Sequence, residues 1–185
     1  MVTIHTVPNN IANSVERWVT GTKIPWYYFD HTLGNDYKGR CEVQQDQFTI
    51  VDMPRLTHYF FPNSTSAEQD RKFVMPLTEW VKKNILPGYE VQRAMGNLTT
   101  QLPNSSNLLN IPHRDCDDDT WFTFLYYVNN SDGNTVFFKD QKIDCEVEPI
   151  KGTGVLFPST TPHAGQVPSI NKNRYVINIL LAKRD

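Results

Sequence analysis

The chain has 185 residues, of which 39 % are hydrophobic and 12 % aromatic, and its formal net charge at pH 7 is -2. This length can bury a substantial core, while two domains would both be small, so we expect a single domain over residues 1–185. The charge gives no basic excess that would draw the protein to nucleic acid or to an anionic membrane, and we expect neither as a partner.

The cysteines and the N-terminal residues bear on the compartment. Cys41, Cys116 and Cys145 are odd in number and form no Cys-x-x-Cys pair, which fits a reduced protein better than a disulfide framework. The chain begins without a basic segment followed by an apolar run, and no later apolar segment is long enough for a bilayer. We therefore expect a cytoplasmic protein; the sequence leaves its oligomeric state open.

Helical periodicity is concentrated in the first half of the chain. Apolar residues recur at helical spacing over 10–20 and again over 66–85. Pro76 lies inside the second segment and should kink that helix or divide it in two. His58 lies between the two segments without a neighbouring metal ligand at a useful spacing, so we expect a structural role for it.

Short β-prone runs separated by turn residues fill the rest of the chain. They span 24–29, 48–53, 56–61, 91–102, 121–128, 135–138, 146–150, 154–157, 163–167 and 174–182. The aromatic run at 24–29 predicts a buried or half-buried strand, and 129–134 predicts a hairpin turn. This pattern indicates a mainly β jelly roll braced by a few helices, with a support region at 1–90 and the metal-binding core at 91–185.

The candidate metal site combines four residues. His113 and Asp115 are two residues apart and would share one face of an extended segment, while His163 lies fifty residues later and Arg174 eleven beyond it. Two histidines and one carboxylate with open positions are typical ligands of an iron(II) centre. Arg174 would then pair in bidentate fashion with a dicarboxylic co-substrate. Taken alone, these residues also fit a structural ion pair involving Arg114 and a loop histidine at position 163.

Further sequence motifs surround these four residues, and both their order along the chain and the spacing between them are informative. They are His113-Arg-Asp115, Thr123-Phe-Leu-Tyr-Tyr127-Val-Asn129, Asp132-Gly133-Asn134-Thr135-Val-Phe137, Lys151-Gly152-Thr-Gly154-Val-Leu-Phe157-Pro158, Pro162-His163-Ala164-Gly165 and Arg174-Tyr175. Through them the stretch from Leu109 to Leu181 resembles the 2-oxoglutarate and iron(II)-dependent dioxygenases, within them the prolyl 4-hydroxylase-like branch. The combination is specific, although it covers only about two fifths of the chain.

The resemblance implies a double-stranded β-helix with iron at its mouth. It implies that His113, Asp115 and His163 bind iron(II), and that Arg174 pairs with the C5 carboxylate of 2-oxoglutarate. Tyr127 matches a position whose phenol also hydrogen-bonds that carboxylate in some relatives. Because adjacent strand residues face opposite ways, the sequence leaves open whether Tyr126 or Tyr127 points into the barrel.

The implied reaction uses dioxygen and 2-oxoglutarate, releases succinate and carbon dioxide, and hydroxylates an unactivated C–H bond. A peptidyl residue such as proline is the favoured substrate by branch, and a free amino acid or another small metabolite is the alternative. Nucleic-acid demethylation is disfavoured because those relatives carry a second arginine six residues after the co-substrate arginine, where this chain has Leu180. A non-catalytic jelly roll that binds a metal or a small acid is the alternative from another class, and succinate formation separates it from an enzyme.

Two departures from the family pattern affect the site. The family often has two glycines where this chain has Gly133-Asn134, and asparagine also tolerates left-handed turn conformations. Some relatives carry a tyrosine that reaches the metal near the position of Leu102, which cannot hydrogen-bond. The loop at 103–110 could close over substrate or be an ordinary surface turn.

Overall fold

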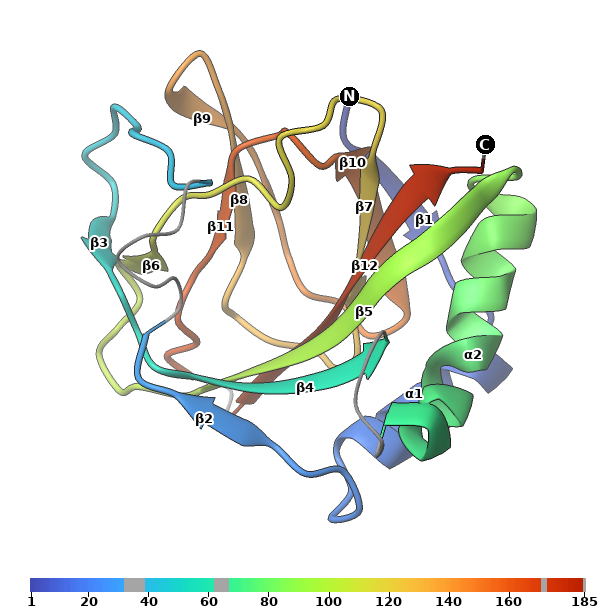
Figure 1. Ribbon diagram of the computed structural model, residues 1–185. Helices are drawn as coiled ribbons and strands as arrows, with labels where there is room; N and C mark the ends of the chain where they lie inside the picture. Colours follow the sequence, from blue (N-terminus) through green and yellow to red (C-terminus); the bar gives the residue numbers. More distant parts are fainter. Residues whose placement is uncertain (32–38, 62–66, 171–172, 185) are drawn as a thin grey trace.

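The computed structural model describes residues 1–31, 39–61, 67–170 and 173–184, in which it places two helices and twelve strands (Figure 1). In chain order they are β1 (Thr3–Thr6), α1 (Asn9–Val19), β2 (Tyr27–Phe29), β3 (Thr49–Val51), β4 (Arg55–Phe61), α2 (Ala67–Asn84), β5 (Tyr89–Thr100), β6 (Leu108–Asn110), β7 (Phe122–Tyr127), β8 (Thr135–Lys139), β9 (Lys142–Val147), β10 (Thr153–Pro158), β11 (His163–Gly165) and β12 (Asn173–Lys183). The prediction of a mainly β chain, with its few helices in the N-terminal half, is confirmed.

Seven strands form one antiparallel sheet, in the order β1-β10-β7-β12-β5-β4-β2. At its centre β12 pairs with β5 on one edge and with β7 on the other. The N-terminal half also contributes to this sheet, because β1 pairs with β10 and β4 pairs with β5. Strands from both ends of the chain therefore build the surface that carries the site.

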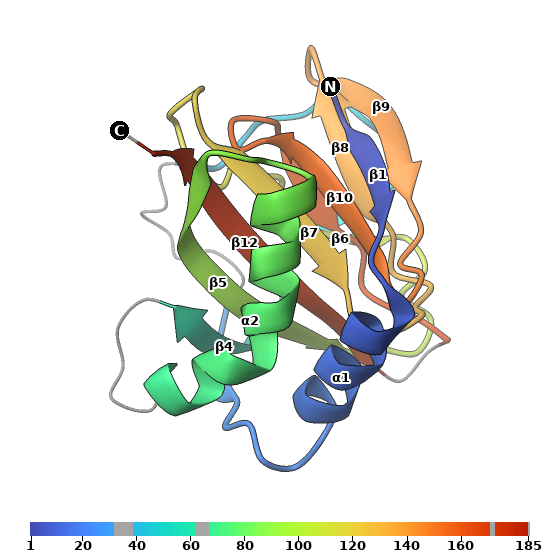
Figure 2. The ribbon, with the colours of Figure 1, turned by 90° about the vertical axis from the view of Figure 1, so that its right-hand side faces the viewer.

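Both helices cover the same face of this sheet (Figure 2). The buried face of α1 includes Val15 and Val19, which belong to one core cluster with Ile177 and Ile179 of β12. Because successive strand residues point to opposite faces, Asn178 and its i±2 neighbours on β12 point away from the helices. The far face of the sheet is thereby left to line the interior.

The second helix continues through its proline. α2 runs from Ala67 to Asn84 with Pro76 inside it, so the helix is not divided there. A proline in a helix interior costs about 3 kcal/mol or more. Burial of Leu77 and Val81 in the core, together with stacking of Trp18 on Phe73 at a ring separation of 4.0 Å, offsets that cost.

A smaller layer faces the large sheet. β11, β8 and β9 form an antiparallel three-stranded sheet in that order, and β3 pairs in parallel with β6. A bridge between Leu109 and Gln166 joins the two small sheets. Between the layers, Phe137 of β8 meets Phe157 of β10 edge to face, with ring centroids 4.9 Å apart. These two facing layers correspond to the predicted jelly roll.

The predicted hairpin at 129–134 is wrong. β7 lies in the large sheet and β8 in the small one, so the connection crosses between layers. Both edges of β7 are already occupied, by β10 and β12, and no edge is left for β8. The strand predicted at 146–150 also begins earlier, because β9 spans Lys142–Val147 and pairs with β8.

The aromatic run at 24–29 is not the buried strand that its composition predicted. Only 27–29 form a strand, β2, and its side chains are exposed: Tyr27 by 51 %, Tyr28 by 66 % and Phe29 by 37 %. β2 is the last strand of the large sheet and has a neighbour, β4, on one side only. A terminal strand with this exposure has little apolar surface to pack against.

Two further observations concern the cysteines and the two helices. The three cysteines are free thiols. Among the described residues, neither helix combines the length and the apolar character that a bilayer crossing requires.

Candidate metal centre

The two histidines of the predicted site face each other across an antiparallel bridge. The backbone N–H of His113 donates to the carbonyl of His163 at 2.9 Å, and the N–H of His163 donates back to His113 at 2.9 Å. Their ring centroids lie 4.7 Å apart. The segment after β6 thus pairs with the start of β11, and this pairing sets the separation of two residues that lie far apart in the sequence.

Asp115 completes the cluster. One ligand atom from each of His113, Asp115 and His163 lies within 4.8 Å of the other two. The Asp115 backbone N–H donates to the carbonyl of Ser159 at 3.0 Å, which holds the segment in place beyond the histidine. The structure therefore brings together the three residues that the sequence singled out.

Backbone carbonyls select the tautomer of both imidazoles. Nδ1 of His113 lies 3.1 Å from the carbonyl oxygen of Ile111, and Nδ1 of His163 lies 3.0 Å from that of Thr161. A carbonyl oxygen can only accept, so in each neutral ring Nδ1 carries the hydrogen and Nε2 carries the lone pair. This is the protonation pattern that a metal-binding histidine needs.

The carboxylate of Asp115 is held from three strands. Its Oδ2 atom accepts a hydrogen bond from the Thr123 hydroxyl of β7 at 2.8 Å and another from the Asn178 amide of β12 at 3.0 Å. Its Oδ1 atom lies 3.6 Å from a guanidinium nitrogen of Arg93 on β5. The Asn178 amide oxygen lies 3.4 Å from that guanidinium. The amide NH2 group of Asn178 therefore faces the Asp115 carboxylate, and its oxygen faces Arg93.

Burial and neighbouring charges set the protonation states of the cluster. Burial is the main cause that lowers the pKa of His113 to about 4, and the charge of His163 adds to this effect. Burial alone would raise the pKa of Asp115, but the charges of His163 and His113 outweigh it and lower that pKa. At neutral pH the His113 imidazole is therefore neutral and the Asp115 carboxylate is ionised, as metal coordination requires.

Arg174 is the second residue of β12 and is buried, with 6 % of its surface exposed. Its Nε donates to the carbonyl of Gly133 at 2.7 Å, and one terminal nitrogen donates to the Thr135 hydroxyl at 2.8 Å. A Cβ at position 165 would lie 3.2 Å from a guanidinium nitrogen of Arg174, so Gly165 permits this close approach. Because a guanidinium has five N–H donors and two are engaged here, donors remain for a carboxylate.

The two adjacent tyrosines of β7 point to opposite faces. The Tyr127 hydroxyl donates to Thr135 at 2.8 Å, and the guanidinium carbon of Arg174 lies 5.9 Å from the Tyr127 ring centroid. Tyr126 instead belongs to the core cluster under the helices. Of the two, Tyr127 is the one on the side of Arg174, where it lies behind Thr135.

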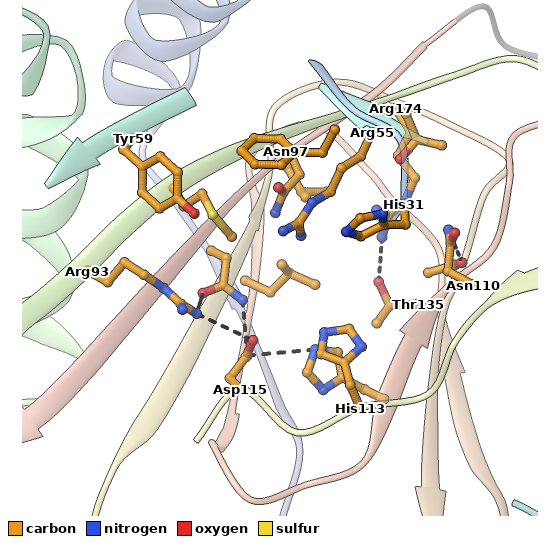
Figure 3. A pocket seen from close by; sticks show the side chains of 18 residues that line it. His31, Arg55, Tyr59, Arg93, Asn97, Asn110, His113, Asp115, Thr135 and Arg174 are labelled. Carbon is orange, nitrogen blue, oxygen red and sulfur yellow. Dashed lines mark hydrogen bonds and ion pairs between the residues drawn. The ribbon is translucent and has the colours of Figure 1, made fainter. Parts of the chain in front are cut away.

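A cavity of about 410 Å³ joins these groups (Figure 3). The metal cluster, Thr135 and Arg174 line it together. The other lining residues described here include Arg55 of β4 and Arg93 of β5. The three candidate metal ligands and Arg174 therefore open into one space, while Tyr127 does not line it.

Several of these contacts were missed by the sequence reasoning. Asn178 and Thr123 hold Asp115, and Thr135 links Arg174 to Tyr127. A signal was available for two of them: Asn178 lies four residues after Arg174, and Thr123 four before Tyr127, so each shares a strand face with a predicted site residue. Nothing in the sequence distinguished Thr135 or Arg93 in the same way.

Within the cluster, Nε2 of His163 also lies 3.7 Å from Oδ2 of Asp115, while Arg114 and His58 make contacts elsewhere. Arg114 pairs with Asp117 at 3.4 Å. His58 is buried outside the cavity, with Nδ1 2.8 Å from the carbonyl oxygen of Pro25 and Nε2 3.4 Å from Asp70.

The loop at 103–110 contacts the cavity only at its end. The Ser105 hydroxyl donates to the carbonyls of Leu102 and Pro168, and only Asn110 of this segment lines the cavity. Leu102 is 39 % exposed and does not line the cavity, so it supplies no substitute for the tyrosine of some relatives.

The donor set fits iron(II). Two neutral imidazoles and one carboxylate suit iron(II), and they converge at the wall of an open cavity, as a catalytic metal requires. The outer hydrogen bonds from Ile111, Thr161, Thr123 and Asn178 match the usual support of such ligands.

Comparison with known proteins gives a family match within this part of the chain. Residues 106–181 match the 2OG-Fe(II) oxygenase superfamily, whose members use iron(II), 2-oxoglutarate and dioxygen. Among curated protein sequences, none is significantly similar to this chain.

Solved structures share the fold at low sequence identity. A 2OG-Fe(II) oxygenase family oxidoreductase from Burkholderia pseudomallei has a TM-score of 0.64 at 11 % identity, covering 100 % of this chain and 86 % of its own. A prolyl hydroxylase from Trichoplax adhaerens, solved with a peptide fragment of hypoxia inducible factor, has a TM-score of 0.61 at 16 % identity, with 98 % and 83 % covered. A prolyl-4-hydroxylase from Pseudomonas putida has a TM-score of 0.55 at 15 % identity, with 99 % and 92 % covered.

These likenesses establish the fold. The stretch that matches the 2OG-Fe(II) oxygenase superfamily, residues 106–181, contains His113, Asp115, His163 and Arg174.

Proposed function

We propose that this protein is a 2-oxoglutarate and iron(II)-dependent dioxygenase, and that it hydroxylates an unactivated C–H bond of a peptidyl residue such as proline. In each turnover dioxygen and 2-oxoglutarate would be consumed and succinate and carbon dioxide released, with one oxygen atom entering the substrate and the other entering succinate. The observation that carries this proposal is the shared cavity, in which the His113, Asp115 and His163 cluster and Arg174 line one space.

The ligand roles follow from the chemistry of the side chains. His113, Asp115 and His163 would hold iron(II), which supplies the activation of dioxygen when bound. Thr123 and Asn178 would keep the carboxylate in one orientation, because each donates a hydrogen bond to its Oδ2 atom. Because the Asp115 carboxylate is already oriented, metal binding would not have to immobilise it.

Arg174 would bind the C5 carboxylate of 2-oxoglutarate. A buried guanidinium is costly without an anion, and a carboxylate matches its planar donors. The Thr135 oxygen already accepts hydrogen bonds from Arg174 and Tyr127, so its own O–H is left to donate to an acceptor in the cavity that it lines. Tyr127 would then act on the co-substrate through Thr135.

A peptide substrate is supported by the rim of the cavity. Phe29 and Tyr59 line it and are 37 % and 38 % exposed, and Tyr27 and Tyr28 extend the aromatic surface along β2. Exposed aromatic side chains are frequent where proteins bind peptides. Within the cavity, Leu125 and two further apolar residues, Met95 and Val176, could contact an uncharged ring such as that of proline. The Trichoplax prolyl hydroxylase, with its bound peptide fragment, provides a fold-level precedent.

The test is succinate release after anaerobic loading with iron(II) and 2-oxoglutarate, followed by admission of oxygen. We expect slow turnover without substrate in the wild type, loss of turnover in His113→Ala, and a raised KM for 2-oxoglutarate in Arg174→Ala. Screening of proline-containing peptides and free amino acids by mass spectrometry would then locate the hydroxyl group. Failure to bind both iron(II) and 2-oxoglutarate would refute the proposal, and hydroxylation of free amino acids alone would refute its peptide part.

A further inference from the structure

Arg174 is not the only guanidinium in the cavity. Arg55 and Arg93 also line it, from the neighbouring strands β4 and β5. Figure 3 shows both side chains among the groups that surround the open space. Among the described residues that line the cavity, Asp115 is the only carboxylate. Among these described lining residues, arginines therefore outnumber carboxylates.

The co-substrate would occupy only part of this cavity. Iron(II) with Asp115 would carry one net positive charge and Arg174 adds a second, and the two negative charges of 2-oxoglutarate match these two. Arg55 and Arg93 line the volume that is left for substrate. In a partly enclosed cavity their effect on an anion is stronger than it would be in open water.

The contacts of Arg93 leave it capable of binding an anion. Its nearest acceptors are Asp115 at 3.6 Å and Asn178 at 3.4 Å, both longer than an ordinary hydrogen bond. Its Nε atom is buried and has no hydrogen-bond acceptor within the described part of the chain. Since 28 % of the side chain is exposed, a ligand in the cavity can still reach it.

Arg55 approaches the same volume from the rim. Its guanidinium carbon lies 5.7 Å from the ring centroid of Phe29, another cavity residue. The two arginines thus flank the space between the rim and the cluster.

We propose that Arg55 and Arg93 form a second anion subsite, which selects substrates that carry a carboxylate near the carbon to be hydroxylated. The inference rests on the proposed function and narrows its substrate class. The carboxylate could belong to an acidic side chain of a peptide or to a free carboxylic acid, and both would meet the same two guanidinium groups. Bidentate pairing of arginine with carboxylate supplies the selectivity.

Three sets of proline-containing peptides test the subsite; they are identical except that the residues flanking proline are Glu, Gln or Lys. Free proline and glutarate represent small acids. Binding is measured by calorimetry to enzyme loaded with Mn(II) and a 2-oxo acid analogue that cannot be decarboxylated, and hydroxylation is measured separately with iron(II). We expect the acid-bearing probes to bind about tenfold or more tightly than the Gln set, and this preference to shrink as salt is raised.

The variants are Arg55→Gln, Arg93→Gln and Arg93→Lys, with Arg184→Gln as a matched control. Arg184 lies outside the cavity, with 76 % of its side chain exposed, so its loss should leave the preference intact. Arg55→Gln should reduce the preference about tenfold without changing Mn(II) affinity. Arg93→Lys should retain part of the preference, which separates an anion subsite from a role in holding Asp115 alone.

The possible outcomes distinguish failure of the anion subsite from failure of the proposed oxygenase function. Equal binding of the Glu and Gln sets, or no binding of any acid-bearing probe, by an enzyme that releases succinate would overturn the subsite and leave the oxygenase standing. Loss of succinate release in the wild type would instead overturn the proposed function. Preference for the Glu peptides over the free acids would assign the carboxylate to a peptide, and the reverse would assign it to a small acid.

Discussion

The hydrogen bond from Asn178 to Asp115 offers a direct test of how the metal site is built. Asn178→Ala removes a donor that lies 3.0 Å from Oδ2 of Asp115, together with the acceptor that faces Arg93. Asn178 is buried, so no bulk water replaces the amide without rearrangement. The carboxylate would keep its bond from Thr123 but lose the contact that constrains it from β12.

The size of the effect can be bounded in two ways. A hydrogen bond to a charged group contributes about 1.5–3 kcal/mol, and 1.4 kcal/mol corresponds to a tenfold change in an equilibrium constant. Loss of an outer partner of a metal ligand generally weakens metal binding about 10- to 100-fold. Because Thr123 and Arg93 still contact Asp115, we expect the lower end, about a tenfold loss of affinity.

The assay is titration of the metal-free protein with Mn(II) or iron(II) under anaerobic conditions. Asn97→Ala is the matched control: Asn97 also lines the cavity, but its amide oxygen accepts from Thr57 at 3.1 Å rather than facing Asp115. Wild-type affinity in Asn178→Ala would refute the view that this amide orients the ligand. An equal loss in both variants would point to a general disturbance of the cavity.

The remaining predictions concern the co-substrate, the packing and the effect of pH. Arg174→Lys keeps the charge but not the bidentate geometry, so the KM for 2-oxoglutarate should rise about tenfold or more while Mn(II) affinity stays unchanged in a parallel titration. Gly154→Ala would place a Cβ in steric overlap with the Phe124 ring, so the free energy of unfolding in urea should fall by about 1–3 kcal/mol, and an unchanged midpoint would contradict this packing. Burial lowers the pKa of His113 to about 4 in the folded protein, so the unfolded chain binds a proton at this residue more readily. The free energy of unfolding of the metal-free protein should therefore fall as pH decreases from about 6.5 towards 4. A free energy of unfolding that stays flat or increases over that pH range would count against a buried neutral imidazole.

Local sequence patterns were sufficient to predict the helices and strands that show a regular apolar or β-prone pattern. The helix at α1 and the long strands β5 and β12 follow from apolar periodicity and from β-prone composition. The cluster of His113, Asp115 and His163 was accessible because the i, i+2 spacing and the flanking motifs identify a chemistry that needs all three. Arg174 was accessible as a charge within an otherwise apolar strand, which requires a partner.

The tertiary structure decided what depends on which strands become neighbours. The hairpin predicted between β7 and β8 does not form, because β10 and β12 occupy both edges of β7. The aromatic strand β2 is exposed because it ends the sheet. Strand pairing of this kind joins residues far apart in the chain, and no local pattern records it.

The metal ligands could be predicted from the sequence, whereas the residues that hold them in place could not, because strand pairing decides those contacts. Sequence alone determined the type of metal site and the residues expected to bind the metal, since these follow from side-chain chemistry and spacing. Only the tertiary structure placed Asn178, Thr123 and Arg93 around Asp115, and Tyr127 rather than Tyr126 behind Arg174. Those contacts depend on register across β5, β7 and β12, where a shift of one residue would turn each side chain to the other face.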